Sequence, residues 1–286
     1  MKNRNSVLGE GSFSLSFGNS GEIAHFYQAN GFPLGIYQPL LSRLGQNLNL
    51  HALALRPTWS NIGDPPQNRS WEIYANDLIL YIEANFKDPI IAIGHSMGAT
   101  CTAIAAKARP DLFKALVLIE PAMVSKPLAW LISISPKVIM NKIEPVRSTL
   151  KRREIWSSRD EFEKSYRIKS MFKGFNEEAM EALIQYGITE TADGNYKFDF
   201  PRLWEAHNYR KPPNIMRILT NLDIPCVAIR GKPSIFLSES MWQEWKSHSK
   251  RSVFFENLEQ GHLFPLENPE NCNELIQKGL SAIKID

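Results

Sequence analysis

The sequence has few cysteines, a small net charge and no long apolar run. Its three cysteines are widely spaced in 286 residues, which argues against a disulfide framework. Its net charge of +3 is too small to indicate a nucleic-acid partner. Its longest apolar run, residues 128–135, is closed by Pro136 and is too short to cross a bilayer. We therefore predict that Cys101, Cys226 and Cys272 are reduced, packed thiols, and that the protein has no nucleic-acid partner and no membrane span.

Two further absences concern location and cofactors. The first six residues are polar and lead directly into a strand-like alternation, without the apolar centre of a secretory signal. The spacing of histidines, cysteines and carboxylates that is typical of a metal site is also missing from the sequence. We expect a cytoplasmic protein that acts on a small-molecule substrate with no metal and no other cofactor. Its oligomeric state, monomer or homodimer, is left open.

Strand-like and helix-like patterns alternate through much of the chain, which predicts an α/β protein. Residues 48–55 alternate as a strand, residues 71–86 repeat apolar side chains at helical spacing, and residues 88–93 carry an isoleucine-rich run. A strand, a helix and a strand in this order imply a right-handed parallel crossover. The pattern predicts a mostly parallel central sheet flanked by helices. We also expect residues 12–26 to form a hairpin, because turn residues at 18–21 separate two short strands.

The stretch with the clearest chemical meaning is Gly94-His95-Ser96-Met97-Gly98. It lies between the isoleucine-rich run and an alanine-rich run, residues 99–106, which is typical of a helix packed closely on a sheet. The five residues therefore form a sharp strand-to-helix turn with Ser96 at its apex. The turn exposes the serine hydroxyl at the positive end of a helix, where the N–H of Met97 is free to bind a developing oxyanion.

This G-x-S-x-G turn in its strand–turn–helix context resembles the nucleophile elbow of the α/β-hydrolase superfamily. The resemblance covers most of the chain outside a central segment, and it implies the α/β-hydrolase fold with Ser96 as the nucleophile. In that family a loop after an early strand usually carries His-Gly-x-Pro. Here the loop reads Asn30-Gly31-Phe32-Pro33, with asparagine in place of histidine. Since Pro33 has no N–H, the N–H of Phe32 is the second oxyanion donor that the resemblance implies.

A serine hydroxyl needs an adjacent base to take its proton, and His262 is the candidate. It follows the last predicted strand, residues 251–255, at the position where the resembling family carries its catalytic histidine. We expect Asn30, His95 and Phe264, which lie in or beside these motifs, to contact the substrate.

The acid of the triad is the point at which the sequence departs from the family. The usual aspartate would follow the strand that ends at Arg230-Gly231, but Ser234 stands where it is expected. Some relatives, including a subset of haloalkane dehalogenases, place the acid after the strand that follows the elbow helix, and Glu120 holds that position here. The order Ser96, Glu120, His262 also keeps the serine–acid–histidine order of the fold. We favour Glu120; Glu239, a serine–histidine dyad or another carboxylate stay open.

The strand–helix rhythm breaks between residues 124 and 215. Helical patterns dominate there, and no convincing buried strand is visible. We interpret this segment as a helical cap inserted into a hydrolase core, with residues 1–123 as the first part of the core and residues 216–286 as the second.

These observations predict a serine hydrolase that cleaves a carboxylic ester of a small to medium hydrophobic substrate through an acyl-enzyme. The same groups would serve in hydrolysis of a thioester or of a carbon–carbon bond next to a ketone, and the sequence does not separate these reactions. A different class is a non-catalytic ligand-binding member of the fold, suggested by the missing aspartate. The intact serine and histidine argue against it.

Overall fold

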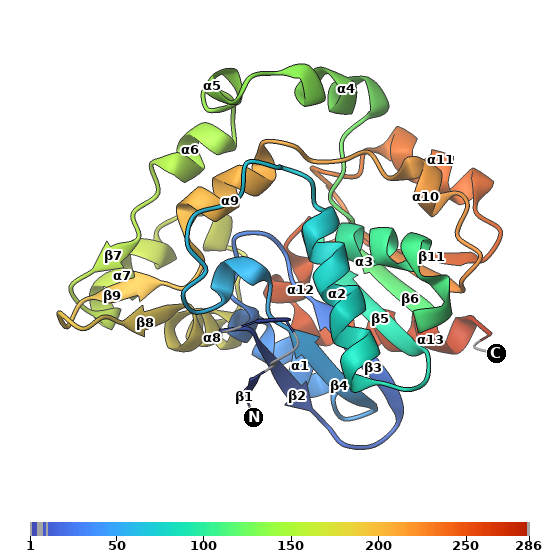
Figure 1. Cartoon of the computed structure of the whole chain (residues 1–286). Coiled ribbons are helices and arrows are strands. Elements are labelled where there is room, and N and C mark those ends of the chain that lie inside the picture. Colours follow the sequence, from blue (N-terminus) through green and yellow to red (C-terminus); the bar gives the residue numbers. More distant parts are fainter. Residues whose placement is uncertain (1, 5–7, 10, 285–286) are drawn as a thin grey trace.

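The computed structural model describes residues 2–4, 8–9 and 11–284, and an eight-stranded sheet runs through its centre (Figure 1). Its two edge pairs at the amino-terminal side, β1 with β2 and β2 with β4, are antiparallel, and the other pairs are parallel. The predicted mostly parallel sheet is confirmed. In spatial order the strands are β1 (Lys2–Arg4), β2 (Phe13–Phe17), β4 (Leu48–Leu53), β3 (Glu22–Tyr27), β5 (Ile90–His95), β6 (Phe113–Ile119), β10 (Cys226–Gly231) and β11 (Ser252–Asn257).

The central strands β5 and β10 are buried along their whole length, which is why they read as continuous apolar runs rather than as alternating ones. Helices cover the sheet on both sides. The helices α2 (Glu72–Asn85) and α3 (Met97–Ala108) pack together on one face, and α1 (Gln38–Leu44) and α13 (Pro269–Ala282) pack together on the other (Figure 1). Further helices outside the cap segment are α10 (Met216–Leu219), α11 (Glu239–His248) and α12 (Phe264–Glu267), with short 3₁₀ turns at η2 (Leu34–Tyr37), η3 (Arg56–Thr58) and η4 (Pro110–Leu112).

The hairpin predicted for residues 12–26 is wrong. Both strands exist, but β2 and β3 do not pair with each other, because β4 lies between them and pairs with each. The turn residues at 18–21 instead turn the chain around the end of β4. Gly18 and Gly21 have positive φ, and a Cβ on either would overlap backbone oxygens of residues 45–48.

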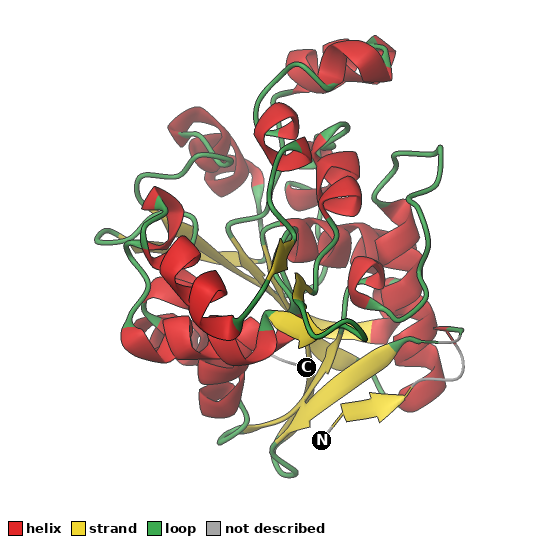
Figure 2. Ribbon diagram, turned by 90° about the vertical axis from the view of Figure 1, so that its left-hand side faces the viewer, coloured by secondary structure: helices red, strands yellow, loops and turns green. Residues whose placement is uncertain are grey.

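The segment between β6 and β10 rises above the carboxyl ends of the sheet strands and forms a separate layer (Figures 1 and 2). Helices are its main regular elements, as the pattern predicts. It also contains a three-stranded antiparallel sheet in the order β7-β9-β8, which corrects the expectation that no strand occurs there. Its elements are α4 (Lys126–Ile134), α5 (Lys137–Met140), α6 (Val146–Leu150), β7 (Ile155–Trp156), α7 (Arg159–Arg167), η5 (Ser170–Phe172), α8 (Glu177–Tyr186), β8 (Ile188–Glu190), β9 (Tyr196–Phe198) and α9 (Arg202–Tyr209).

The sequence did not predict the cap strands because each has only two or three residues. Such short strands do not show the alternation of apolar and polar side chains that identifies a strand. The exact limits of the cap at residues 124 and 215 stay a prediction.

The three cysteines lie free and fully buried in the core, as predicted. Within the described part of the chain, no helix combines the length and the apolar character that crossing a bilayer requires.

Candidate active site

Ser96 occupies the single residue between β5 and α3, the predicted strand-to-helix turn. Its backbone has φ 55° and ψ −120°, a conformation that is rare for a residue with a side chain and costs on the order of 1–3 kcal/mol. The surrounding contacts hold it there: its N–H donates to the carbonyl of Ile119 at 2.9 Å, and its carbonyl accepts from the N–H of Ala122 at 3.2 Å. The elbow is therefore tied to the end of β6, the strand that leads into Glu120.

The two glycines of the motif allow the elements on either side of Ser96 to approach closely. A Cβ on Gly98 would lie 2.1 Å from the carbonyl oxygen of Tyr27 in β3, and one on Gly94 would lie 2.6 Å from the Cα of Ala99. Real side chains do not tolerate such distances, so the turn needs hydrogen at both positions.

Ser96, His262 and Glu120 form one chain of hydrogen bonds. The Ser96 hydroxyl lies 2.9 Å from Nε2 of His262, and Nδ1 of the same ring lies 3.0 Å from Oε2 of Glu120. Since the carboxylate only accepts, Nδ1–H donates to Glu120 and Nε2 accepts from the serine. The three residues come from turns after β5, β6 and β11, far apart in sequence. This is the geometry that a base-activated serine nucleophile requires.

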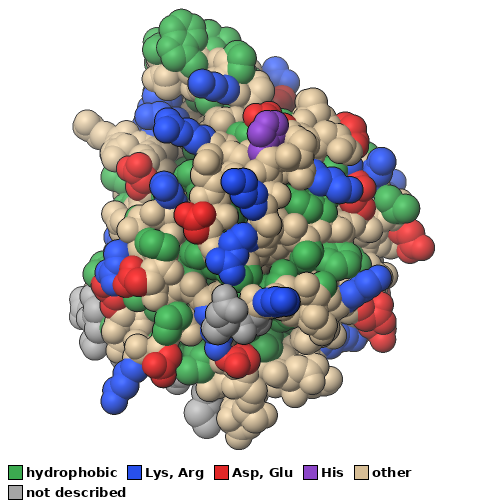
Figure 3. Space-filling view, turned by 90° about the vertical axis from the view of Figure 1, so that its right-hand side faces the viewer, with side chains coloured by type: hydrophobic (Ala, Val, Ile, Leu, Met, Phe, Trp, Pro, Cys, Tyr) green, Lys and Arg blue, Asp and Glu red, His purple; other side chains and the backbone are tan. Residues whose placement is uncertain are grey.

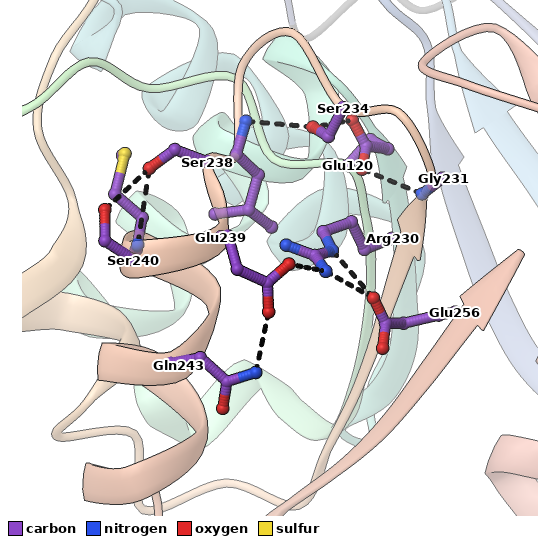
Figure 4. Close-up of polar contacts among 11 residues, drawn as sticks. Glu120, Arg230, Gly231, Ser234, Ser238, Glu239, Ser240, Gln243 and Glu256 are labelled. Atoms are coloured by element: carbon purple, nitrogen blue, oxygen red, sulfur yellow. Dashed lines mark hydrogen bonds and ion pairs between the residues drawn. The ribbon is translucent and has the colours of Figure 1, made fainter. Parts of the chain in front are cut away.

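Glu120 follows β6 with φ 48° and is fully buried. Its Oε1 accepts from the N–H of Gly231 at 2.8 Å, and its Oε2 accepts from the hydroxyl of Ser234 at 2.7 Å (Figure 4). Ser234 thus occupies the place where an aspartate was expected and donates a hydrogen bond to the glutamate.

Glu239, the alternative acid, is directed to another partner. Its carboxylate lies 2.6 Å from Nη2 of Arg230 and accepts from the amide of Gln243 at 2.8 Å (Figure 4). Arg230 also pairs with Glu256. Glu239 therefore belongs to a separate ionic cluster with Arg230 and Glu256.

Burial shapes the charge states of the site. It raises the pKa of the Glu120 carboxyl to about 7, against the opposing effect of the hydrogen bonds from Ser234 and Gly231, which favour the carboxylate. It lowers the pKa of His262 to about 3, so the imidazole is neutral at neutral pH and able to accept a proton. Ser96 is only 5% exposed and the His262 side chain 9%, so little water reaches these groups.

The predicted oxyanion donors are the N–H groups of Met97 and Phe32. Met97 is the first residue of α3, so its N–H has no carbonyl one turn earlier to bond. Phe32 follows Gly31, whose φ of +84° bends the loop, and the Phe32 ring contacts the cap residue Phe172 at 6.4 Å between centroids. The roles of both N–H groups stay predictions.

Asn30 makes its contacts with the cap helix α9. Its amide nitrogen donates to the carbonyl of Glu205 at 3.2 Å, and its amide oxygen accepts from the side chain of Asn208 at 2.8 Å. The substitution of asparagine for the family's histidine therefore gives the oxyanion loop a direct connection to the cap. Its predicted contact with substrate remains untested.

His95 and Phe264 are fully buried, which places them behind the site rather than on its surface. His95 donates through Nε2 to the carbonyl of His262 at 2.9 Å, and its Nδ1 accepts from the hydroxyl of Tyr37 at 2.7 Å. Nε2 thus holds the backbone of His262, and the bond from Tyr37 to Nδ1 orients the His95 ring. That these two side chains contact substrate stays a prediction.

Two residues around the site were not found in the sequence, Tyr37 and Asn208. Tyr37 orients His95, as above. Asn208 accepts from the hydroxyl of Tyr74 at 2.7 Å through its side chain, and its carbonyl accepts from the indole N–H of Trp71 at 3.1 Å. The contacts named here join residues 58 to 178 positions apart along the chain, so no local pattern points to them.

A cavity of about 1550 Å³ lies between residues 57–64 and the small cap sheet, and residues 33–35, which follow Phe32, also line it. Leu34 lines it, but Ser96, Glu120 and His262 do not.

Among the described residues, no group of three histidine, cysteine or acidic side chains is arranged to hold a metal ion.

The chain is similar in sequence to known proteins over most of its length. The model of the alpha/beta hydrolase family matches residues 24–275. The Abhydrolase domain-containing protein ACTT2 of Alternaria alternata is 27% identical over 227 residues, which cover 66% of this chain and 82% of that protein. The type I acyl-CoA thioesterase mpaH of Penicillium roqueforti is 25% identical over 170 residues, which cover 54% of this chain and only 37% of the thioesterase.

Solved structures show the same fold. E-2-(acetamidomethylene)succinate hydrolase superposes with a TM-score of 0.77 at 18% identity, covering 95% of each chain. The enol-lactonase from Burkholderia xenovorans LB400 superposes with a TM-score of 0.65 at 14% identity, covering 95% of this chain and 97% of the other.

Proposed function

The chain belongs to the alpha/beta hydrolase family, and from this premise we propose that it is a serine hydrolase that cleaves a carboxylic ester of a small to medium hydrophobic substrate. One observation carries the proposal: the hydrogen bonds of 2.9 and 3.0 Å that join Ser96, His262 and Glu120. Ser96, His262 and Glu120 are its nucleophile, base and acid. Its location in the cytoplasm and its oligomeric state stay predictions.

The first half of the proposed reaction forms an acyl-enzyme. The Ser96 oxygen attacks the carbonyl carbon while Nε2 of His262 takes its proton, and the carbonyl oxygen becomes an oxyanion held by the N–H groups of Phe32 and Met97. Glu120 keeps the ring in the tautomer that leaves Nε2 free and stabilises the imidazolium. When the tetrahedral intermediate collapses, the imidazolium gives its proton to the departing alkoxide.

In the second half, water replaces the alcohol. His262 removes a proton from the water as its oxygen attacks the acyl carbon, and the intermediate then releases the carboxylic acid while the proton returns to Ser96. A serine at the elbow does not support the alkyl-enzyme chemistry of dehalogenases and epoxide hydrolases, which needs a carboxylate nucleophile.

A thioester is the second candidate substrate, and the similarity to an acyl-CoA thioesterase of Penicillium roqueforti favours it. The same nucleophile and oxyanion donors attack a thioester carbonyl, with a thiolate as the leaving group. Cleavage of a carbon–carbon bond beside a ketone is a third reaction that the same groups could perform.

A substrate panel tests the proposal. Purified protein is given p-nitrophenyl esters of increasing chain length, short acyl-CoA thioesters and a β-diketone, beside the Ser96→Ala variant and a control, Ser247→Ala, whose serine lies exposed on α11. We expect hydrolysis of short esters that Ser96→Ala abolishes and Ser247→Ala preserves. Activity on thioesters alone would change the substrate class, and activity that survives Ser96→Ala would overturn the mechanism.

A further inference from the structure

The residues 126–143, which we call the α4–α5 surface, carry apolar side chains that the described part of the structure leaves uncovered. In α4 only Ile132 is buried, and in α5 only Met140. Trp130 is 66% exposed and Val138 68% exposed. Other large apolar side chains exposed on the same segment are Leu128, Leu131, Ile134, Ile139 and Ile143. So many exposed apolar side chains along one short stretch mark an interaction site.

The position of the surface makes it accessible. The helices α4 and α5 form the top edge of the molecule in Figures 1 and 2, on the side away from the central sheet. The space-filling view shows hydrophobic side chains gathered at this edge, with lysine or arginine side chains just below (Figure 3).

The surface is held in place at both ends. The N–H of Val124 donates to the carbonyl of Pro213 at 3.1 Å, and the carbonyl of Val124 accepts from the side chain of Asn214 at 2.6 Å. Beyond α5, the side chain of Asn141 accepts from Nε of Arg210 at 2.8 Å. The exposed apolar residues therefore belong to an anchored part of the cap.

The charge of the segment is of one sign. Between Pro121 and Ile143 the sequence has Lys126, Lys137 and Lys142 and no aspartate or glutamate. All three lysines are exposed. Exposed tryptophan and aliphatic side chains flanked by lysines match the interface of a bilayer, where indole rings lie at the level of the headgroups and lysines pair with anionic lipids.

We propose that the α4–α5 surface docks on an anionic lipid bilayer, with Trp130 and its apolar neighbours in the interface and the three lysines against the headgroups. A second copy of this chain fits less well. A two-fold contact would bring the lysines of both copies together, and the segment has no acidic side chain to neutralise them. The proposal does not depend on which reaction the site performs.

Vesicle flotation with the full chain tests the docking. We expect the protein to float with vesicles of phosphatidylcholine containing about 30% phosphatidylserine, and much less with phosphatidylcholine alone. The double variant Trp130→Ser/Leu131→Ser should lower the bound fraction about tenfold, and the triple variant Lys126→Glu/Lys137→Glu/Lys142→Glu should lower it at least as much.

The control is Ile168→Ser/Leu258→Ser, which removes apolar side chains that are 79% and 70% exposed outside the surface. It should bind vesicles like the wild type. Circular dichroism and melting temperature check the fold of each variant without reference to activity. Absence of binding to anionic vesicles, or binding that the Trp130 and Lys variants leave unchanged, would overturn the proposal. A dimer in sedimentation that Trp130→Ser/Leu131→Ser dissociates, without vesicle binding, would assign the surface to a second copy.

Discussion

At the scale of the residue, the site is distinguished by where its carboxylate comes from. Glu120 lies after β6 and reaches Nδ1 of His262, while Ser234 after β10 supplies a hydroxyl that donates to the same carboxylate oxygen. The longer glutamate side chain and the short serine together fill the position that a single aspartate after β10 would take. Loss of the family's aspartate therefore does not remove the acid from the site.

The substitution Glu120→Gln tests this role. A neutral amide neither stabilises the imidazolium nor fixes the tautomer in the same way, so kcat should fall about 10²–10⁴-fold in the ester assay, while the fold survives. Glu239→Gln is the matched control and should leave kcat near the wild-type value, because Glu239 contacts Arg230 and Gln243 instead. The reverse outcome would move the acid to Glu239.

The pH dependence of kcat/KM should report the same carboxyl. Burial raises the pKa of Glu120 to about 7, so lowering the pH through that value protonates the acid and removes its support of His262. The neutral imidazole itself persists at such pH values, since burial lowers the pKa of His262 to about 3. We expect kcat/KM to rise with pH, with a midpoint at about pH 7, and to level off about one pH unit above it. A profile that stays flat between about pH 5 and pH 8 would contradict this assignment.

The elbow motif pointed to Ser96 and the family resemblance to His262, while Glu120 was favoured over alternatives that the sequence left open. The structure brings the three side chains together because each follows a strand whose carboxyl end lies on one edge of a parallel sheet. Burial was not visible in the sequence. His95 and Phe264 stand beside the motifs, and both side chains are fully buried, which their position along the chain does not reveal.

At the scale of the element, the strand–turn–helix unit of β5, Ser96 and α3 was predictable because its signals are local. An isoleucine-rich run, two glycines and an alanine-rich run occupy less than 20 residues. The pairing of β2 was not predictable, since β2 and β3 flank a turn yet pair with β4, which comes later in the chain. Strand order depends on such long-range contacts, and local turn residues do not report it.

The close approach of α3 to β3 gives an element-scale prediction. In Gly98→Ala the new methyl group would meet the carbonyl oxygen of Tyr27, so the helix must shift and the elbow with it. We expect a loss of about 1–3 kcal/mol in the free energy of unfolding and a fall in kcat of about tenfold or more. Urea denaturation and ester kinetics measure the two effects.

The control for this change is Gly63→Ala, where an added Cβ meets nothing within 4 Å. It should leave kcat unchanged, with only the modest cost of a side chain at positive φ. A Gly98→Ala variant with wild-type kcat would show that the elbow tolerates the shift.

At the scale of the whole molecule, the cap is connected to the oxyanion loop and to the core through Asn208. This buried residue of α9 contacts Asn30 in the loop, and both Trp71 and Tyr74 at the start of α2. The loop that carries Phe32 is therefore positioned by the cap as well as by the sheet.

The substitution Asn208→Ala removes the side-chain hydrogen bonds to Asn30 and Tyr74. The Tyr74 hydroxyl and the Asn30 amide oxygen are then buried without this partner. We expect the free energy of unfolding to fall by about 1–3 kcal/mol and kcat to fall about ten- to a hundredfold, because the oxyanion loop loses its support. Asn221→Ala, at an exposed position after α10, is the control for both measurements. An Asn208→Ala variant that loses stability but keeps kcat would show that the cap does not position the loop.

The layout of the molecule could be anticipated in part. The break in strand–helix rhythm predicted a cap between the two parts of the core. The small β7-β9-β8 sheet stayed hidden because its strands have only two or three residues, and the Asn208 contacts stayed hidden because they join residues distant in sequence. The contacts between the cap and the loop that carries Asn30 join residues far apart in sequence, so the sequence did not reveal them.

The central claim, that His262 activates Ser96 as a nucleophile, is tested most directly by covalent labelling. Purified protein is mixed with a fluorophosphonate, and intact-mass and peptide mass spectrometry follow the adduct over time. We expect a single adduct on Ser96 that is absent in Ser96→Ala and forms at least about 10³-fold more slowly in His262→Ala. An adduct on another residue, or labelling of Ser96 at the wild-type rate in His262→Ala, would contradict it.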